Sequence, residues 1–290
     1  MFEGAWTALA TPFRDDVVDE RALRELVDAQ IADGIDGLMP CGTTGESVCL
    51  SHAEHVLVAR TVIEQAKGRV PVVVGSGTAS TKHTLELCEV AKALGADGVL
   101  IASPYYNRPS QEGLFAHFKL VAEKGGLPVV LYNIPGRCGV DVALSTLERL
   151  AAVPLIVAVK EATGQVGRSA DIAALFGSRF TILSGDDALT LPIMAVGCRG
   201  VVSVASNLAP ALIARQVDLQ LAGDLAGALA VAQRLRPLYE VLFVESSPGP
   251  VKAGLAMQGR AAPEIRLPLV MPSEATQARL RRVLSELSLL

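Results

Sequence analysis

The sequence has few aromatic residues, no closely spaced cysteines and only a small net charge. Phe, Trp and Tyr make up 4% of its 290 residues, so a tyrosine at a conspicuous position carries more weight than usual. The five cysteines, at positions 41, 49, 88, 138 and 198, include no C-x-x-C pair. This scatter argues against both a disulfide framework and a zinc site. We therefore expect free thiols and no bound metal.

Long apolar runs and extended basic patches are also missing. Half of the residues are hydrophobic, but charged residues interrupt the apolar runs before any reaches the ~20 residues of a membrane span. The first residues lack the basic and apolar regions of a signal peptide. The net charge is −4, and the basic cluster at Arg279, Arg281 and Arg282 fits the polar face of a helix. We expect a cytoplasmic protein that binds neither a nucleic acid nor a membrane.

Short apolar runs alternate with longer segments of helical periodicity, which is typical of βα units around a parallel sheet. Gly-x-x-Gly segments that start at Gly34, Gly95 and Gly197 each end a helix and lead into a strand, and glycine suits the left-handed cap there. No linker rich in Pro, Gly or Ser separates these units. The pattern predicts eight strands, at residues 5–10, 37–41, 70–75, 98–102, 129–132, 155–160, 181–184 and 201–205.

The predicted fold is therefore α/β, a (β/α)8 TIM barrel over residues 1–223. Residues 224–290 continue as helices, which we expect to pack on the barrel as an appended region rather than to form an independent domain. The first of these helices starts at Asp224 and has an apolar stripe expected to be buried, formed by Leu225, Leu229, Ala232 and Leu235.

Lys160 ends an apolar run that is predicted to be a buried strand. The strand period of two puts Lys160, Ala158 and Ile156 on one face, so the ammonium group would project into an apolar interior. Desolvation would lower its pKa from about 10.4 toward neutrality and leave a nucleophilic amine able to form a Schiff base. The alternative is a strand-end lysine whose charged group reaches water.

Three further residues near these segments bear on reactivity. Lys252 is the rival nucleophile, but its proline-flanked position before a helix predicts less desolvation than a barrel strand gives Lys160. Cys41 and Cys138 flank two of the motifs described next, where a thiol of low pKa would be prone to oxidation.

Five polar motifs each follow an apolar, strand-like run. In a βα barrel the active site lies where the carboxyl ends of the strands meet the following loops, so motifs gathered at that end favour function over coincidence. The motifs are Gly42–Glu46, Tyr105–Pro109, Tyr132–Arg137, Lys160–Gly164 and Ser184–Asp187.

Each motif also has a plain structural interpretation. The Gly42–Glu46 loop suits a bound anion such as phosphate, or it is a tight turn. Tyr132 is either a general acid and base or an amphipathic strand end, and Arg137 either clamps a carboxylate or lies on the surface. Asp186 and Asp187 look like a metal pair, but adjacent carboxylates at a helix start more often cap it, which is what we expect.

Together and in this order, the motifs resemble the dihydrodipicolinate synthase family, within the N-acetylneuraminate lyase superfamily of Schiff-base aldolases. The resemblance extends from Ala10 to about Pro268. It implies a lyase that condenses pyruvate with L-aspartate 4-semialdehyde to 4-hydroxy-tetrahydrodipicolinate, the first committed step of diaminopimelate and lysine biosynthesis. It implies no cofactor, because the Schiff base on Lys160 is the electron sink.

The resemblance also implies roles for single residues. Tyr132 would donate and accept the proton, and Thr44 would link it to Tyr106, which a neighbouring subunit would supply across a tight dimer. The expected assembly is a homo-oligomer, a dimer of dimers.

Other residues of the motifs match substrate-binding positions of the family. Thr43 and Thr44 match residues that bind the keto-acid carboxylate, and Arg137 matches the residue that receives the carboxylate of the aldehyde. Gly185 and Val202 match positions whose backbone groups hold the first substrate. Arg137 and the paired threonines favour the synthase over sugar-acid lyases. Another pyruvate-dependent aldolase or lyase acting on a sugar acid or hydroxy-oxo acid, or a non-catalytic keto-acid-binding paralogue, remains as an alternative.

Part of the family's lysine effector site is also matched. Ala79 and His83 fall where feedback-sensitive members have an amide and a carboxylate, so we predict weak or absent inhibition by lysine. The matching effector residues are Ser47, His52, His55 and Tyr105.

Overall fold

The computed structural model describes residues 2–290 and divides into two compact units. The first unit consists of residues 72–202 with residues 2–3, and the second of residues 4–71 and 203–290. The predicted boundary after residue 223, between a barrel and its appended helices, stays a prediction. No helix within residues 2–290 is long and apolar enough to cross a membrane.

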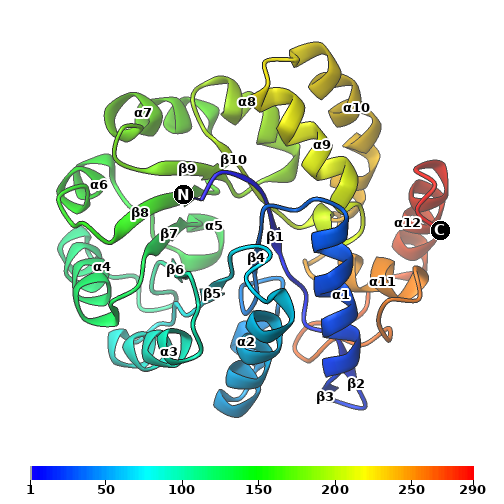
Figure 1. Cartoon of the computed structure of the whole chain (residues 1–290), viewed down its shortest axis with the longest axis horizontal. Coiled ribbons are helices and arrows are strands. Elements are labelled where there is room, and N and C mark those ends of the chain that lie inside the picture. Colours follow the sequence, from blue (N-terminus) through cyan, green and yellow to red (C-terminus); the bar gives the residue numbers. More distant parts are fainter. Residues whose placement is uncertain (1) are drawn as a thin grey trace. The chain divides into compact units, whose positions relative to one another are not determined.

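Parallel strands form the centre of the first unit (Figure 1). Their residues are almost entirely buried, as expected of near-continuous Val, Ile and Leu runs covered on both faces. The order in the sheet follows the chain from β5 to β10. The strands are β5 (Val73–Gly75), β6 (Gly98–Ala102), β7 (Val129–Asn133), β8 (Ile156–Glu161), β9 (Thr181–Ser184) and β10 (Gly200–Ser203), whose last residue belongs to the second unit.

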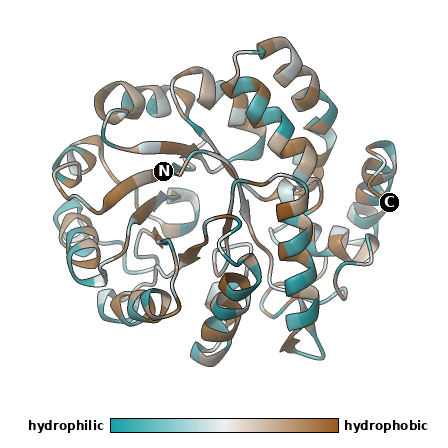
Figure 2. Ribbon diagram, viewed as in Figure 1, coloured by the Kyte–Doolittle hydropathy of each residue, from teal (hydrophilic) through white to brown (hydrophobic). Residues whose placement is uncertain are grey.

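Helices connect these strands and lie along their outer side in Figure 1. Ser80 and Ser110 cap the first two, each side chain accepting the backbone N–H of the residue three positions further on. Figure 2 shows brown, apolar strands beside helices that carry both colours. The connecting helices are α3 (Thr81–Ala93), α4 (Gln111–Gly125), α5 (Pro135–Cys138), α6 (Leu144–Leu150), α7 (Val166–Phe176), η2 (Asp187–Leu189) and α8 (Thr190–Ala195).

The second unit contains two parallel strands, a small hairpin and the remaining helices. Strand β1 (Gly4–Ala8) pairs with β4 (Gly37–Met39), and β2 (Phe13–Arg14) pairs antiparallel with β3 (Val17–Val18). The helices are α1 (Glu20–Ala32), η1 (Ser47–Cys49), α2 (His52–Ala66), η3 (Ala205–Asn207), α9 (Pro210–Leu221), α10 (Leu225–Val241), α11 (Gly249–Met257) and α12 (Glu274–Glu286).

All eight predicted strands are confirmed, with ends that differ by a few residues. Gly34, Gly95 and Gly197 all have positive φ, as predicted for left-handed caps. The β2–β3 hairpin was not predicted. The predicted stripe of α10 is correct for Leu235, which is buried, and wrong for Leu225 and Leu229, which are 61% and 51% exposed. Apolar residues lie on every side of this helix, so periodicity alone did not identify the buried face, which is Ala228, Leu235, Leu238, Tyr239 and Val241.

Candidate active site

Lys160 lies near the carboxyl end of β8, beside Tyr132 on β7. Its side chain is only 5% exposed, and its Nζ lies 4.0 Å from the centre of the Tyr132 ring. Burial lowers the pKa of Lys160 to about 7; the Asp187 carboxylate opposes this shift, and the Arg137 guanidinium adds to it. The predicted desolvation is thus confirmed, and a large fraction of the amine is neutral and nucleophilic near pH 7.

Gly185, directly after β9, makes room for the lysine side chain. A Cβ atom at this position would lie 3.1 Å from Lys160 Cε and 2.7 Å from the Cβ atom of Ala162. The Gly185 N–H donates to Glu161 O at 2.8 Å, which ties the loop to the end of β8. Glycine is needed here because backbone passes close beside the lysine stem.

The paired carboxylates after Gly185 have different surroundings. Asp186 caps η2, accepting the Ala188 N–H at 2.9 Å, which confirms the predicted cap for this residue. Asp187 is 3% exposed and acts on the charge of Lys160. Among residues 2–290, no group of three or more His, Cys, Asp or Glu side chains is placed to hold a metal ion.

Arg137 lies on α5, a single turn of helix that follows β7 directly. Its guanidinium is exposed, yet its charge acts on the Lys160 amine. The turn ends at Gly139, which has a φ of +73° and whose carbonyl accepts Arg108 Nε at 2.9 Å. A cation able to bind a carboxylate thus lies within the electrostatic range of a buried nucleophile.

Sequence reasoning missed a polar cluster beside these residues. Asn133 and Glu161, each one residue beyond Tyr132 and Lys160, are buried and hydrogen bonded to each other, and Glu161 is ion-paired with Arg168. The available signal was the charged residue that follows Lys160 in its motif, because a carboxylate at a buried strand end needs a partner.

The Gly42–Glu46 loop belongs to the second unit and forms a compact turn. The Glu46 N–H donates to Thr43 O at 3.1 Å, and the Ser47 N–H donates to Gly42 O at 3.2 Å. Thr44 is 3% exposed, whereas Thr43 faces solvent. A Cβ atom at Gly45 would lie 3.1 Å from the backbone N of Cys41, so only glycine fits this turn without displacement.

A buried ion pair anchors this loop. Lys252 Nζ donates to Glu46, both side chains are 1% exposed, and Nζ lies 4.1 Å from the centre of the Phe13 ring. The other Glu46 oxygen accepts the Arg266 N–H at 3.0 Å. Lys252 was expected to be less desolvated than Lys160; it is buried as well, and desolvation lowers its pKa, opposed by Glu46. What separates it from Lys160 is the bound carboxylate, which holds its proton.

The five cysteines are free thiols, as predicted. Burial raises the pKa of Cys41, and it raises the pKa of Cys138 to about 11 despite the nearby Arg137 charge. Neither thiol is the reactive, low-pKa group considered for these positions.

The other predicted residues fall in both units. Tyr106 is 94% exposed with φ of +71°, and Tyr105 is half-buried, which raises its pKa. Val202 is buried in β10. The first unit contains Lys160, Tyr132, Arg137, Gly185, Val202, Tyr105 and Tyr106, and the second contains Thr43, Thr44, Ser47, His52 and His55.

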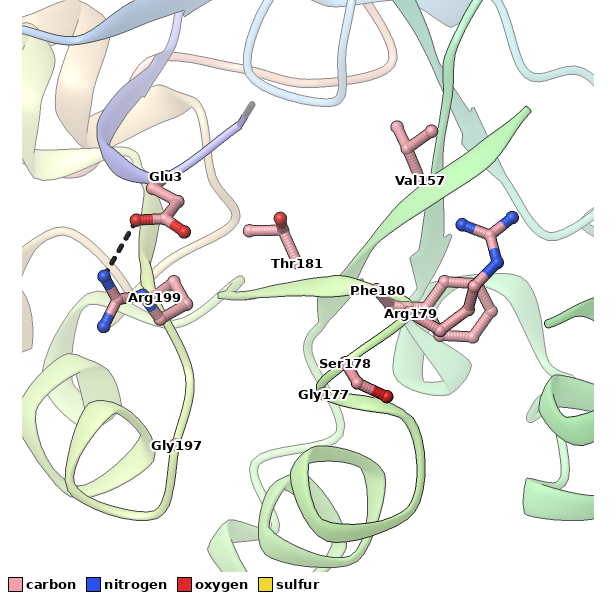
Figure 3. A pocket seen from close by; sticks show the side chains of 9 residues that line it. All are labelled: Glu3, Val157, Gly177, Ser178, Arg179, Phe180, Thr181, Gly197 and Arg199. Atoms are coloured by element: carbon pink, nitrogen blue, oxygen red, sulfur yellow. Dashed lines mark hydrogen bonds and ion pairs between the residues drawn. The ribbon is translucent and has the colours of Figure 1, made fainter. Parts of the chain in front are cut away.

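A separate cavity of about 280 Å³ lies at the opposite ends of the first unit's strands, by Val157 and Thr181 (Figure 3). Its charged groups have partners within the protein. Arg199 is paired with Glu3 at 2.9 Å, and Arg179 donates to three backbone carbonyls, those of Ala151, Val153 and Pro154. The charged side chains that line this cavity are therefore already paired within the protein.

Comparisons with known proteins give full-length matches. A model of the Dihydrodipicolinate synthetase family matches residues 1–287. The 4-hydroxy-tetrahydrodipicolinate synthase of Magnetococcus marinus is 50% identical over 290 residues, which cover 100% of this chain and 99% of the relative. The solved 4-hydroxy-tetrahydrodipicolinate synthase of Methylacidiphilum fumariolicum SolV is 45% identical with a TM-score of 0.97, covering 99% of this chain and 96% of that one.

A further solved relative is a complex with pyruvate. The chloride-inhibited dihydrodipicolinate synthase of Acinetobacter baumannii, complexed with pyruvate, is 38% identical with a TM-score of 0.98, covering 100% of both chains. The matches confirm the predicted resemblance, the (β/α)8-barrel fold class with C-terminal helices, and the predicted lyase activity. The roles predicted for single residues stay predictions.

Proposed function

Because the chain belongs to the dihydrodipicolinate synthetase family, we propose that it condenses pyruvate with L-aspartate 4-semialdehyde to 4-hydroxy-tetrahydrodipicolinate. This reaction would be the first committed step of lysine and diaminopimelate biosynthesis, in the cytoplasm. The observation that carries the proposal is Lys160, a buried amine with a pKa of about 7 beside the Tyr132 ring.

The chemistry starts at the Lys160 nitrogen. The neutral amine attacks the ketone carbon of pyruvate, water leaves, and a Schiff base forms. Loss of a methyl proton gives an enamine, whose carbon attacks the aldehyde of the second substrate. The amino group of that substrate then displaces Lys160 by transimination, which closes the ring and frees the lysine. Tyr132, Thr44 and Tyr106 move the protons in these steps.

Two groups of residues bind the substrate carboxylates. Thr43 and Thr44, on the turn anchored by Glu46, hold the carboxylate of pyruvate, and the backbone at Gly185 and Val202 holds the rest of this substrate. Arg137 receives the carboxylate of the aldehyde, for which its exposed planar group is suited.

Tyr106 supports the proposed homo-oligomer, a dimer of dimers. A tyrosine that is 94% exposed, on a backbone with positive φ, is unusual for a residue with no function. Backbone strain at such a residue persists only where the surroundings hold it, and here Asn107 Nδ2 donates to Ala79 O at 3.0 Å. We propose that a neighbouring subunit uses this side chain in its proton relay.

Regulation by lysine is proposed to be weak or absent. Ser47, His52, His55 and Tyr105 match the family's effector site, but His83 is an exposed residue of α3 where sensitive members have another group. Half-inhibition at submillimolar lysine in a turnover assay would contradict this proposal.

Reductive trapping tests the function. Wild-type protein is treated with pyruvate and borohydride between pH 5.5 and 9, digested and analysed by peptide mass spectrometry, alongside a turnover assay with aspartate 4-semialdehyde. We expect a pyruvyl adduct on Lys160 whose rate of formation rises with pH through about 7, because only the neutral amine attacks. Lys252 is the internal control and stays unmodified, since Glu46 binds its ammonium group.

The other outcomes choose between alternatives. An adduct without turnover keeps the Schiff-base chemistry and assigns the chain to another pyruvate-dependent aldolase or lyase. No adduct at any pH overturns the proposed function and favours a keto-acid-binding protein.

A further inference from the structure

The residues next to Tyr132 and Lys160 form a second pair on the same two strands. Tyr132 is in register with Lys160, and Asn133 is in register with Glu161. Because side chains alternate along a strand, Asn133 and Glu161 point to the face opposite the amine. Both are fully buried, at 0% and 1% exposed.

The Glu161 carboxylate is surrounded by donors. Oε2 accepts Asn133 Nδ2 and Arg168 Nε, both at 3.1 Å, and Oε1 accepts the Thr163 N–H at 2.8 Å. A buried carboxylate with this many partners is stable only while all of them stay in place. The cluster thereby joins β7, β8 and the first turn of α7.

The same cluster also closes the loop that carries Arg137. Asn133 Oδ1 accepts the Val142 N–H at 3.1 Å, and Asn133 Nδ2 lies 2.8 Å from Asp141 Oδ1. Arg168 donates to the Val142 carbonyl. Both ends of the segment between Asn133 and Val142 are therefore held by one set of hydrogen bonds, and Arg137 lies within that segment.

We propose that Glu161, Asn133 and Arg168 act as one positioning unit for the reaction, which sets Lys160 against Tyr132 and holds the Arg137 loop in place. The inference rests on the proposed function. The three residues act through their neighbours and are positioning residues, not catalytic ones. A misplacement of about 1 Å at a reacting group costs ~100-fold in rate, so a cluster that fixes two strands and a loop has a large effect.

The charge of Glu161 is essential to this unit because all three of its partners are donors. A carboxylate accepts at both oxygens, whereas the amide of Glu161→Gln must turn an NH2 group toward Asn133, Arg168 or Thr163. The variant keeps the size of the side chain and loses the hydrogen bonds on one side of the former carboxylate.

The test measures kcat, KM for both substrates and the rate of pyruvate adduct formation in Glu161→Gln, Arg168→Met and the double variant. We expect each single variant to lose about 10–100-fold in kcat and in adduct rate, with a raised KM for the aldehyde. The double variant is expected to lose no more kcat than the more impaired of the two single variants. The effects of substitutions within one unit are not additive. Arg168→Lys keeps a charge and is expected to recover part of the loss.

Arg179→Met is the matched control. Arg179 also binds backbone carbonyls of the first unit, but it lies by the cavity at the opposite strand ends (Figure 3). The Arg179→Met variant is expected to have a lower free energy of unfolding, measured with denaturant, and the wild-type kcat. If Glu161→Gln and Arg168→Met behave like this control, or if their losses in kcat multiply, the positioning unit is wrong. If the wild-type protein itself forms no pyruvate adduct, the proposed function is wrong, and the positioning unit, which rests on it, is wrong as well.

Discussion

Two buried lysines show how surroundings decide the chemistry of the same side chain. Lys252 has the Glu46 carboxylate as a bound partner, and its ammonium group is retained. Lys160 lies against the Tyr132 ring, where desolvation outweighs the attraction of Asp187 and lowers its pKa to about 7. The first lysine stabilises a loop, and the second has a lowered pKa, as the proposed reaction requires.

The lowered pKa of Lys160 predicts a cost in stability. Below about pH 7 the amine is protonated in both the folded and unfolded chain, so the full free-energy cost of burying a charged amine reduces the stability of the fold. Between about pH 7 and its ordinary value of 10.5, only the unfolded chain is protonated, so the penalty falls as pH rises. We expect Lys160→Met to raise the free energy of unfolding by about 4 kcal/mol at pH 6.5, and by progressively less toward pH 10.

Urea unfolding of both proteins at pH 6.5, 8 and 9.5 measures this difference. A gain that is independent of pH would show that packing, and not the charge of the amine, accounts for it. A loss of stability in Lys160→Met would contradict the prediction.

At the scale of elements, α11 holds the turn that follows β4, because Lys252 of α11 binds Glu46 of the Gly42–Glu46 loop. Lys252→Met leaves a buried carboxylate without its cation, which we expect to destabilise the protein by about 3–5 kcal/mol. It should also raise KM for pyruvate more than it lowers kcat, since Thr43 and Thr44 lie on the turn. Thermal unfolding and steady-state kinetics measure the two effects.

The double variant Glu46→Gln/Lys252→Met is the control, because it removes the unpaired charge as well as the cation. It is expected to recover much of the stability. If it is as unstable as Lys252→Met, the lysine acts by filling space rather than by pairing.

Elements were more predictable from sequence than side-chain partners. The strand containing Lys160 and its burial follow from a period of two and an apolar run, which are local features. The bond between Glu161 and Arg168 depends on where a helix starts after a loop, and Glu46 and Lys252 lie 206 positions apart. The buried face of α10 was missed because its apolar residues surround the helix. Tertiary packing decides hydrogen-bond partners and the buried faces of helices. A short sequence pattern carries no information about that packing.

At the scale of the molecule, the proposed exchange of the exposed Tyr106 would connect activity to assembly. If a neighbouring subunit uses this hydroxyl, activity per chain falls when the protein is diluted below its dimer dissociation constant. We expect Tyr106→Phe to lose about 10–100-fold in kcat with no change in sedimentation, because it removes only the proton-transfer group. Analytical ultracentrifugation and turnover at matched concentrations measure both. A purified monomer with full activity would contradict the exchange of Tyr106.

The position of Gly185 has a consequence for the direction from which a second substrate would reach Lys160. The Lys160 side chain lies with its Nζ 4.0 Å from the Tyr132 ring centre, and its Cε is in close contact with the Gly185 backbone position. If the proposed enamine forms on this nitrogen, it would have an aromatic ring and a backbone segment around it in an asymmetric arrangement. Its two faces would be chemically unequal, so the aldehyde would reach the enamine carbon from one side. Because that carbon becomes a CH2 group, the configuration of the product would depend on which face of the aldehyde carbonyl is turned toward it.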